Sequence, residues 1–139
     1  MAYTIDWGRH RVCVTYSGEC DEDTVLQVVI ALQADVRFDS TYEALHDFSA
    51  CTRVTTSAVH MEEIAARNFA AVRSNDKLHI AVIPDREDVN TMLRCFDDIG
   101  LNPYPIEVLP TLEAANAWFA GAALARLRPA GARTRVWRR

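Results

Sequence analysis

The sequence predicts a single α/β domain with a five-stranded mixed sheet and four helices, in the order β-β-α-β-α-β-α-β-α. Short apolar runs that are typical of strands alternate with longer segments whose apolar residues recur at helical spacing. Strands separated by helices and short connections form mostly parallel sheets, but the first two predicted strands are close enough to form an antiparallel hairpin. The 139 residues, half of them apolar, amount to one domain.

The predicted strands are recognised by alternation or by continuous apolar character. Residues 3–7 and 11–16 alternate between polar and apolar side chains, with a tight connection at residues 8–10 and a break at Ser17-Gly18. Residues 44–48 form a third strand and residues 106–109 a short last one. Residues 78–83 are the most apolar run, so we expect them to be central and parallel.

Each predicted helix begins with a side chain that can accept a hydrogen bond from a first-turn amide. These caps are Asp21, Ser57, Asp85 and Thr111, and Gly100 suits the left-handed residue that ends the third helix. The residues expected to face the core are Val25, Val28, Val29 and Leu32; Met61, Ala65, Phe69 and Val72; Val89, Met92, Leu93, Phe96 and Ile99; and Leu112, Ala115, Phe119 and Ala122.

A hydroxyl-rich segment separates the third strand from the second helix. In open α/β sheets, ligands and partners are met at the carboxyl ends of the strands, where this segment lies. We therefore expect this segment and the helix after it to form the working surface of the molecule. The candidate contact residues are Ser49, Thr52, Thr55, Thr56, Ser57 and His60.

Residues 47–59, D-F-S-A-C-T-R-V-T-T-S-A-V, resemble the middle of a STAS domain, the fold of anti-sigma-factor antagonists. Residues 113–119, E-A-A-N-A-W-F, and the order of the elements resemble the SpoIIAA-like branch, and the resemblance covers roughly residues 3–122. It implies a non-enzymatic regulatory or protein-interaction module. The family's phosphorylated serine maps onto Ser57, but Thr55 and Ala58 replace the aspartate and glycine of its Asp-Ser-Ser-Gly motif.

Two roles for Ser57 follow. As a helix cap it would accept an amide hydrogen bond, and this is the role we favour. Glu62 and Glu63 would already supply the negative charge that a first turn attracts, and they would repel an added phosphate. If the resemblance extends to mechanism, the partner is a kinase-type anti-sigma factor and Ser57 is its target.

The alternative function is binding of a small apolar ligand or lipid, since sheet-and-helix folds of this outline also resemble CRAL-TRIO lipid-transfer domains. The pocket would lie between the sheet and the second and third helices, lined by Phe69, Met92 and Phe96. The same three side chains would otherwise fill an ordinary core.

Enzymatic activity is retained only as a residual hypothesis, because the sequence contains no familiar catalytic or nucleotide-binding motif. Cys51 beside His46 or His60 could form a thiolate pair. His46 and Asp47 are adjacent on a strand and point to opposite faces, so we expect a hydrogen-bonded histidine there rather than a metal ligand. We expect no metal ion and no cofactor.

Charge divides the chain into an acidic domain, residues 1–125, and a basic tail, residues 126–139. The tail carries six arginines and no acid, whereas the domain carries 9 basic and 19 acidic residues. The acidic domain should repel nucleic acid, while the tail, which includes Trp137, offers a weak contact to anionic membranes or nucleic acid.

The location and the assembly are also expectations. The chain has neither a membrane-spanning apolar run nor a signal-peptide pattern, so we expect it in the cytoplasm. An exposed Trp118 on the last helix would favour a homodimer.

Overall fold

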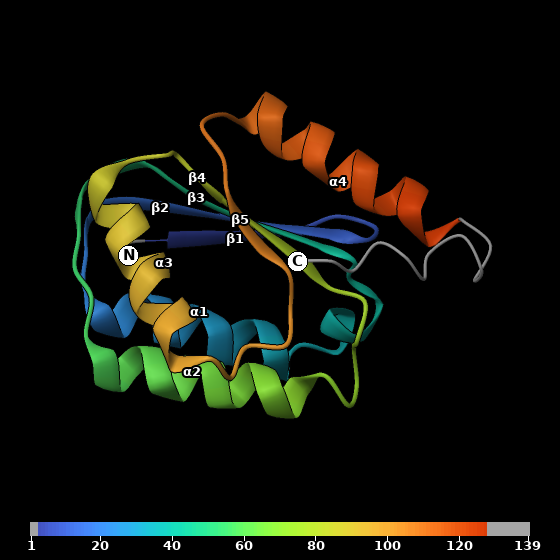
Figure 1. Cartoon of the computed structure of the whole chain (residues 1–139), viewed down its shortest axis with the longest axis horizontal. Coiled ribbons are helices and arrows are strands. Elements are labelled where there is room, and N and C mark those ends of the chain that lie inside the picture. The colour runs from blue at the N-terminus through green and yellow to red at the C-terminus, as the bar shows by residue number, and fades with distance from the viewer. Residues whose placement is uncertain (1–2, 128–139) are drawn as a thin grey trace.

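The computed structural model describes residues 3–127 of the chain. Its five strands form one mixed sheet in the order β1-β2-β3-β4-β5, so each strand lies beside its neighbours in the sequence (Figure 1). The pair β1–β2 is antiparallel and the other pairs are parallel. The strands are β1 (Tyr3–Trp7), β2 (Arg11–Cys20), β3 (Glu43–Val54), β4 (His79–Ile83) and β5 (Ile106–Val108). The predicted fold class is confirmed.

The helices cover the two faces of the sheet unequally. Three of them lie on one face: α1 (Glu22–Ala34), α2 (Ala58–Ala71) and α3 (Glu87–Ile99). The fourth, α4 (Leu112–Arg126), lies on the opposite face (Figure 1). A short 3₁₀ helix, η1 (Val36–Ser40), follows α1. None of the helices in the described part of the chain is long and apolar enough to cross a membrane.

Two hydrophobic cores result from this layering. The larger lies between the sheet and α1–α3 and contains the buried side chains of Val14, Phe48, Met61 and Val89. The smaller lies under α4 and is formed by Leu45, Ala81, Ile83, Ala115 and Phe119. Because β4 contributes to both cores, its residues are apolar on both faces. β4 is parallel as predicted, but the prediction that it is central is wrong, since β3 occupies that place.

Strands β2 and β3 are longer than their apolar runs. They continue past Tyr16 and Phe48 to Cys20 and Val54, pairing Gly18 with Cys51 and Cys20 with Val54. Register shifts interrupt this extension on both sides of Gly18, whose φ is 71°. The predicted ends were wrong because polar residues can continue a strand wherever a neighbour supplies backbone hydrogen bonds and one face meets water.

Two of the four predicted side-chain caps are formed, those of Asp21 and Thr111. Asp21 and Thr111 accept bonds of 3.1 Å from the amides of Thr24 and Ala114, which confirms both caps. The third cap was wrong: α3 begins after Arg86, and Asp85 precedes it by one residue. In the first turn, the Asp88 carboxylate accepts hydrogen bonds from the amide of Val89 and from the amide of Val54 at the end of β3.

The inward faces of α1 and α3 are as predicted, whereas those of α2 and α4 differ. Phe69 is 60% exposed and Leu112 is 49% exposed, so neither faces the core. On α2 the inward stripe runs through Met61, Ile64, Ala65 and Asn68 instead. Asn68 is buried because both its side-chain oxygen and its side-chain nitrogen are hydrogen bonded. With Asn68 facing inward, its neighbour Phe69 faces outward.

We predict that Gly100→Ala lowers the free energy of unfolding by about 1 kcal/mol. Gly100 has a φ of 74° and its Cβ would meet no atom within 4 Å, so the loss reflects backbone conformation alone. Urea unfolding measures it. The matched control is Gly121→Ala inside α4, also free of contacts, which should stabilise by up to about 1 kcal/mol. Equal effects of the two substitutions would contradict this explanation.

Candidate functional site

The elbow between β3 and α2 is shorter than predicted. Ser49 and Thr52 are exposed residues of β3 itself, and only residues 55–57 lie between the strand and the helix. Thr55, Thr56 and Ser57 are half-buried there. We define the elbow as residues 55–57. Ser57 is the residue immediately before α2, and the elbow places it at the carboxyl end of the central strand.

Side chains at the N-terminal end of α3 fix the position of the elbow. The Asp88 carboxylate accepts a 2.8 Å bond from the Val54 amide, and Arg86 donates to both Asp88 and the carbonyl of Cys51. The Arg86 guanidinium, with some opposition from burial, holds the pKa of Asp88 below its usual value. The amide of Thr55 donates to the carbonyl of Cys20. The end of β3 is therefore bound to both β2 and α3.

Ser57 occupies the N-cap position of α2, but its hydroxyl makes no capping bond. The first turn of α2 also contains no acidic residue. Because the helix begins at Ala58, Glu62 and Glu63 fall in its second turn, and Glu63 is paired with Arg67 at 3.0 Å. Both reasons for assigning Ser57 a purely capping role were therefore wrong.

His60 lies close to the elbow in the first turn of α2. Its Nε2 is 2.7 Å from the Asp23 carboxylate of α1. Its Nδ1 and the hydroxyl of Thr56 are buried and find no hydrogen-bond partner within residues 3–127. The elbow and the adjoining first turn of α2 thus hold three polar atoms without protein partners in the described part of the chain, counting the uncapped hydroxyl of Ser57.

The outer face of α2 continues from the elbow and carries large apolar side chains. Val59 is 70% exposed and Phe69 is 60% exposed. Ala66 and Ala70 are exposed between and beside them. α2 packs against both α1 and α3, but this apolar outer face remains exposed to solvent.

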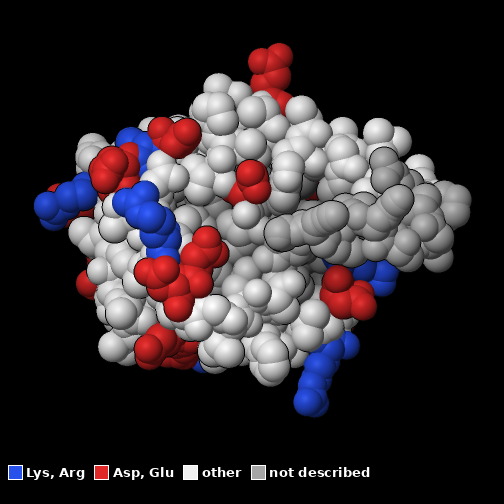
Figure 2. Space-filling model, viewed as in Figure 1, with Lys and Arg blue, Asp and Glu red and all other residues white. Residues whose placement is uncertain are grey.

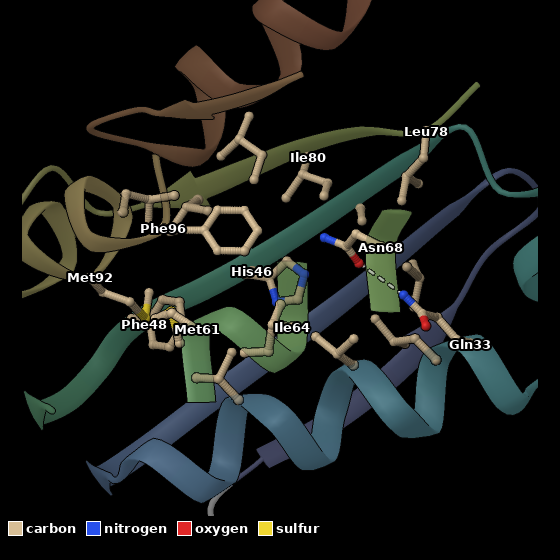
Figure 3. A pocket seen from close by; sticks show the side chains of 18 of the residues that line it. Gln33, His46, Phe48, Met61, Ile64, Asn68, Leu78, Ile80, Met92 and Phe96 are labelled. Atoms are coloured by element: carbon tan, nitrogen blue, oxygen red, sulfur yellow. Dashed lines mark hydrogen bonds between the residues drawn. The ribbon is translucent and has the colours of Figure 1, made fainter. Parts of the chain in front are cut away.

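A cavity of about 80 Å³ lies between the sheet and α1–α3 (Figure 3). Met92 and Phe96 line it, as the pocket hypothesis proposed. Phe69 does not, because it points to solvent from the far side of α2. Most of the remaining lining is aliphatic or aromatic, contributed by all three helices and by the sheet.

His46 stands in the wall of this cavity, in the midst of its apolar side chains (Figure 3). Its Nδ1 is 2.9 Å from the hydroxyl of Tyr16, so the expected hydrogen-bonded histidine is present. Burial lowers the pKa of His46 to about 4. The imidazole is therefore neutral at physiological pH. Sequence reasoning placed this histidine in the core but missed its position beside a cavity.

A chain of amides forms the polar boundary of the cavity. Gln33 of α1 donates to the Asn68 side-chain oxygen at 2.9 Å, and Asn68 donates to Asn102 at 3.1 Å. Asn102 in turn donates to the carbonyl of Tyr104. These bonds explain how an asparagine can be buried on the inward face of α2.

The residual enzymatic hypothesis gains no reactive pair. Burial raises the pKa of the Cys51 thiol and that of Cys20, the latter to about 12, so both stay protonated at neutral pH. His46 is bonded to Tyr16 and His60 to Asp23. Within residues 3–127 no group of three His, Cys, Asp or Glu side chains is arranged to hold a metal ion.

Other predicted contact features lie away from these two places. Trp118 is half-buried, with its ring edge-on to His79 and tilted against Phe119, so it is not the exposed aromatic that was expected. Arg126, the first residue of the predicted tail, lies in α4 with its guanidinium 5.0 Å from the centre of the Tyr42 ring. Residues 128–139, including Trp137, lie outside the described residues.

Charge on the face seen in Figure 2 is concentrated at the end where α3 lies. Two ion pairs lie in and next to α3, Arg86–Asp88 and Arg94–Glu87. The middle of this face carries few charges (Figure 2).

We predict that His46 makes the protein less stable as the pH falls below neutrality. The folded pKa of about 4 lies below the unfolded value of 6.5, so unfolding takes up a proton between these values. The contribution of His46 to the free energy of unfolding is complete above pH 6.5 and falls by roughly 3 kcal/mol towards pH 4. Urea unfolding of the wild type and His46→Gln at several pH values measures it. The variant should lack this loss of stability at low pH. If the free energy of unfolding changed with pH in the same way in both proteins, His46 would not be its source.

Comparison with known proteins identifies the fold. No family model and no curated protein matches the sequence. Solved structures do match: the anti-sigma factor antagonist SpoIIAA in its unphosphorylated form has a TM-score of 0.55 and 14% identity, over 86% of this chain and 99% of that one. An anti-sigma factor antagonist from Mycobacterium paratuberculosis gives 0.54 and 19%, over 84% and 91%.

The phosphorylated form of SpoIIAA from Bacillus is also similar, with a TM-score of 0.50 and 17% identity over 85% of this chain and 99% of that one. In all three cases the match extends over nearly the whole of both chains. The protein has a STAS-like fold, the fold of anti-sigma factor antagonists.

Proposed function

We propose that this protein is a non-enzymatic regulatory module that binds a protein partner through the elbow and the outer face of α2. The observation that carries this proposal is the position of Ser57. It stands before α2, at the carboxyl end of the central strand, in a fold shared with proteins named as anti-sigma factor antagonists. Two of the similar structures represent one such antagonist without and with phosphate.

The surroundings of Ser57 suit a phosphoacceptor. Its hydroxyl is not engaged as a cap, and the first turn of α2 has no carboxylate to repel a phosphate. The positive end of the helix dipole and the free amides of the first turn would stabilise the added negative charge. Phosphorylation would thereby place a double negative charge at one end of the proposed contact surface.

The outer face of α2 supplies the apolar part of that surface. Val59 lies in the first turn of α2, two residues after Ser57, and Phe69 lies near the far end of the helix. Exposed aromatic and aliphatic side chains of this kind anchor interfaces when a partner removes them from water. The partner that this arrangement fits is a kinase of the anti-sigma type, for which Ser57 would be the substrate and Val59 and Phe69 part of the docking surface.

We predict that Ser57 becomes phosphorylated when the full chain is incubated with ATP and an extract of its own cells. Mass spectrometry should find phosphate on Ser57 of the wild type and none on that peptide in Ser57→Ala. Phe69→Glu should reduce the modification by about fivefold or more, because it disrupts docking without touching the hydroxyl. The control is Leu124→Glu on α4, an apolar residue of similar exposure (66%) on the opposite face of the sheet.

Two outcomes separate the parts of this proposal. Suppose that a protein co-purifies from the extract with the wild type and Leu124→Glu but not with Phe69→Glu, and that Ser57 is not modified. This outcome would keep the contact surface and remove the phosphoacceptor. Equal behaviour of the two glutamate variants, in capture and in modification, would contradict the contact surface itself.

A further inference from the structure

His46 is a polar side chain placed at the centre of an apolar layer. It lies on β3 in register with Val14 of β2 and Val82 of β4, and it is 9% exposed. A buried imidazole without hydrogen bonds costs free energy, so each of its two ring nitrogens needs a partner. One partner is Tyr16, which bonds Nδ1. No residue between 3 and 127 bonds Nε2.

The Tyr16 contact decides which nitrogen carries the proton. Tyr16 is fully buried, and the Nδ1 of His46 is the one bonding partner of its hydroxyl within the described residues. If Nδ1 carried the proton, the tyrosine hydrogen and the Nε2 lone pair would both lack partners. If Tyr16 donates to Nδ1, only Nε2–H is left. Because unpaired polar groups inside a core are unfavourable, the arrangement that leaves fewer of them is favoured, and in it Nε2 carries the proton.

The cavity beside His46 gives this donor a place to act. Its lining contains no Lys, Arg, Asp or Glu, and its polar groups besides His46 are the bonded amides of Gln33 and Asn68. Because an unpaired ion would be strongly disfavoured in such surroundings, the site favours a neutral occupant. Water needs two to four polar partners, and the largely apolar walls offer few.

The volume restricts the occupant further. An engineered cavity of about 150 Å³ holds benzene, and one water takes about 30 Å³ of liquid. A cavity of about 80 Å³ therefore accepts a compact molecule and not the acyl chain of a lipid. This narrows the lipid or small-ligand hypothesis to a small ligand.

We propose that the cavity between the sheet and α1–α3 binds a small neutral, mostly apolar molecule that carries one acceptor oxygen of the ketone, aldehyde or ether class. The oxygen accepts a hydrogen bond from Nε2–H of His46, and the hydrocarbon part contacts side chains such as Ile64, Ile80 and Phe96. This inference is independent of the contact surface on α2, because the cavity lies on the inward side of that helix.

The test uses two probes of matched shape, cyclopentanone and cyclopentane, titrated into the full chain and followed by amide chemical shifts in ¹H–¹⁵N spectra. Cyclopentanone should bind saturably, with the largest shifts on β3 and the inward side of α2. In His46→Leu, which keeps an apolar side chain of similar size, its affinity should fall by about tenfold. Cyclopentane affinity should stay the same or rise.

Two further variants control for indirect effects. Ala44→Val places a larger side chain in the cavity wall while His46 is kept, and it should lower the affinity for both probes. His79→Leu makes the same substitution on the other face of the sheet and should leave both affinities unchanged. The proposal is overturned if cyclopentanone produces no saturable shifts, if His46→Leu changes both probes equally, or if Ala44→Val leaves cyclopentanone binding intact.

Discussion

The central strand β3 has parallel neighbours on both sides and helices on both faces, so a polar side chain in its middle must find its partner inside the protein. His46 meets this constraint through Tyr16, whose hydroxyl lies 2.9 Å from Nδ1. The tyrosine ring is itself fixed, since it stacks on Phe48 with ring centres 4.1 Å apart. Packing of the larger core thus holds the hydrogen bond, and the hydrogen bond makes a histidine tolerable there.

The same strand positions both candidate sites. In its middle, β3 presents His46 to the cavity on the side of α1–α3. At its end, the Val54 amide is held by Asp88, and this contact sets where the strand stops and α2 begins. Three residues later Ser57 occupies the cap of α2. A ligand in the cavity and a partner on α2 would therefore contact opposite sides of one helix.

Local patterns predicted the elements and most of their ends. The caps at Asp21 and Thr111, the left-handed Gly100 and the inward stripe of α1 depend on residues within a few positions of one another. The features that sequence patterns missed depend on distant partners. Asn68 is buried because Gln33 and Asn102, 35 and 34 residues away, complete its hydrogen bonds, and the outward turn of Phe69 follows from it.

In the candidate site, too, some features could be predicted from local sequence and others depend on distant residues. The position of Ser57 was predictable, because a hydroxyl before an amphipathic run marks a helix start. The length of β3 was not, since residues 49–54 mix polar and apolar side chains without a clear strand pattern and pair only with β2. The cavity was also beyond prediction, because it is a gap left by side chains from three helices and the sheet.

The protonation state of His46 tests the central claim most directly. Long-range ¹H–¹⁵N spectra of the imidazole rings at pH 7 distinguish the two neutral tautomers from the imidazolium. We expect a neutral His46 ring with the proton on Nε2 and an unprotonated Nδ1 that accepts from Tyr16. A proton on Nδ1, or a doubly protonated ring, would contradict this expectation.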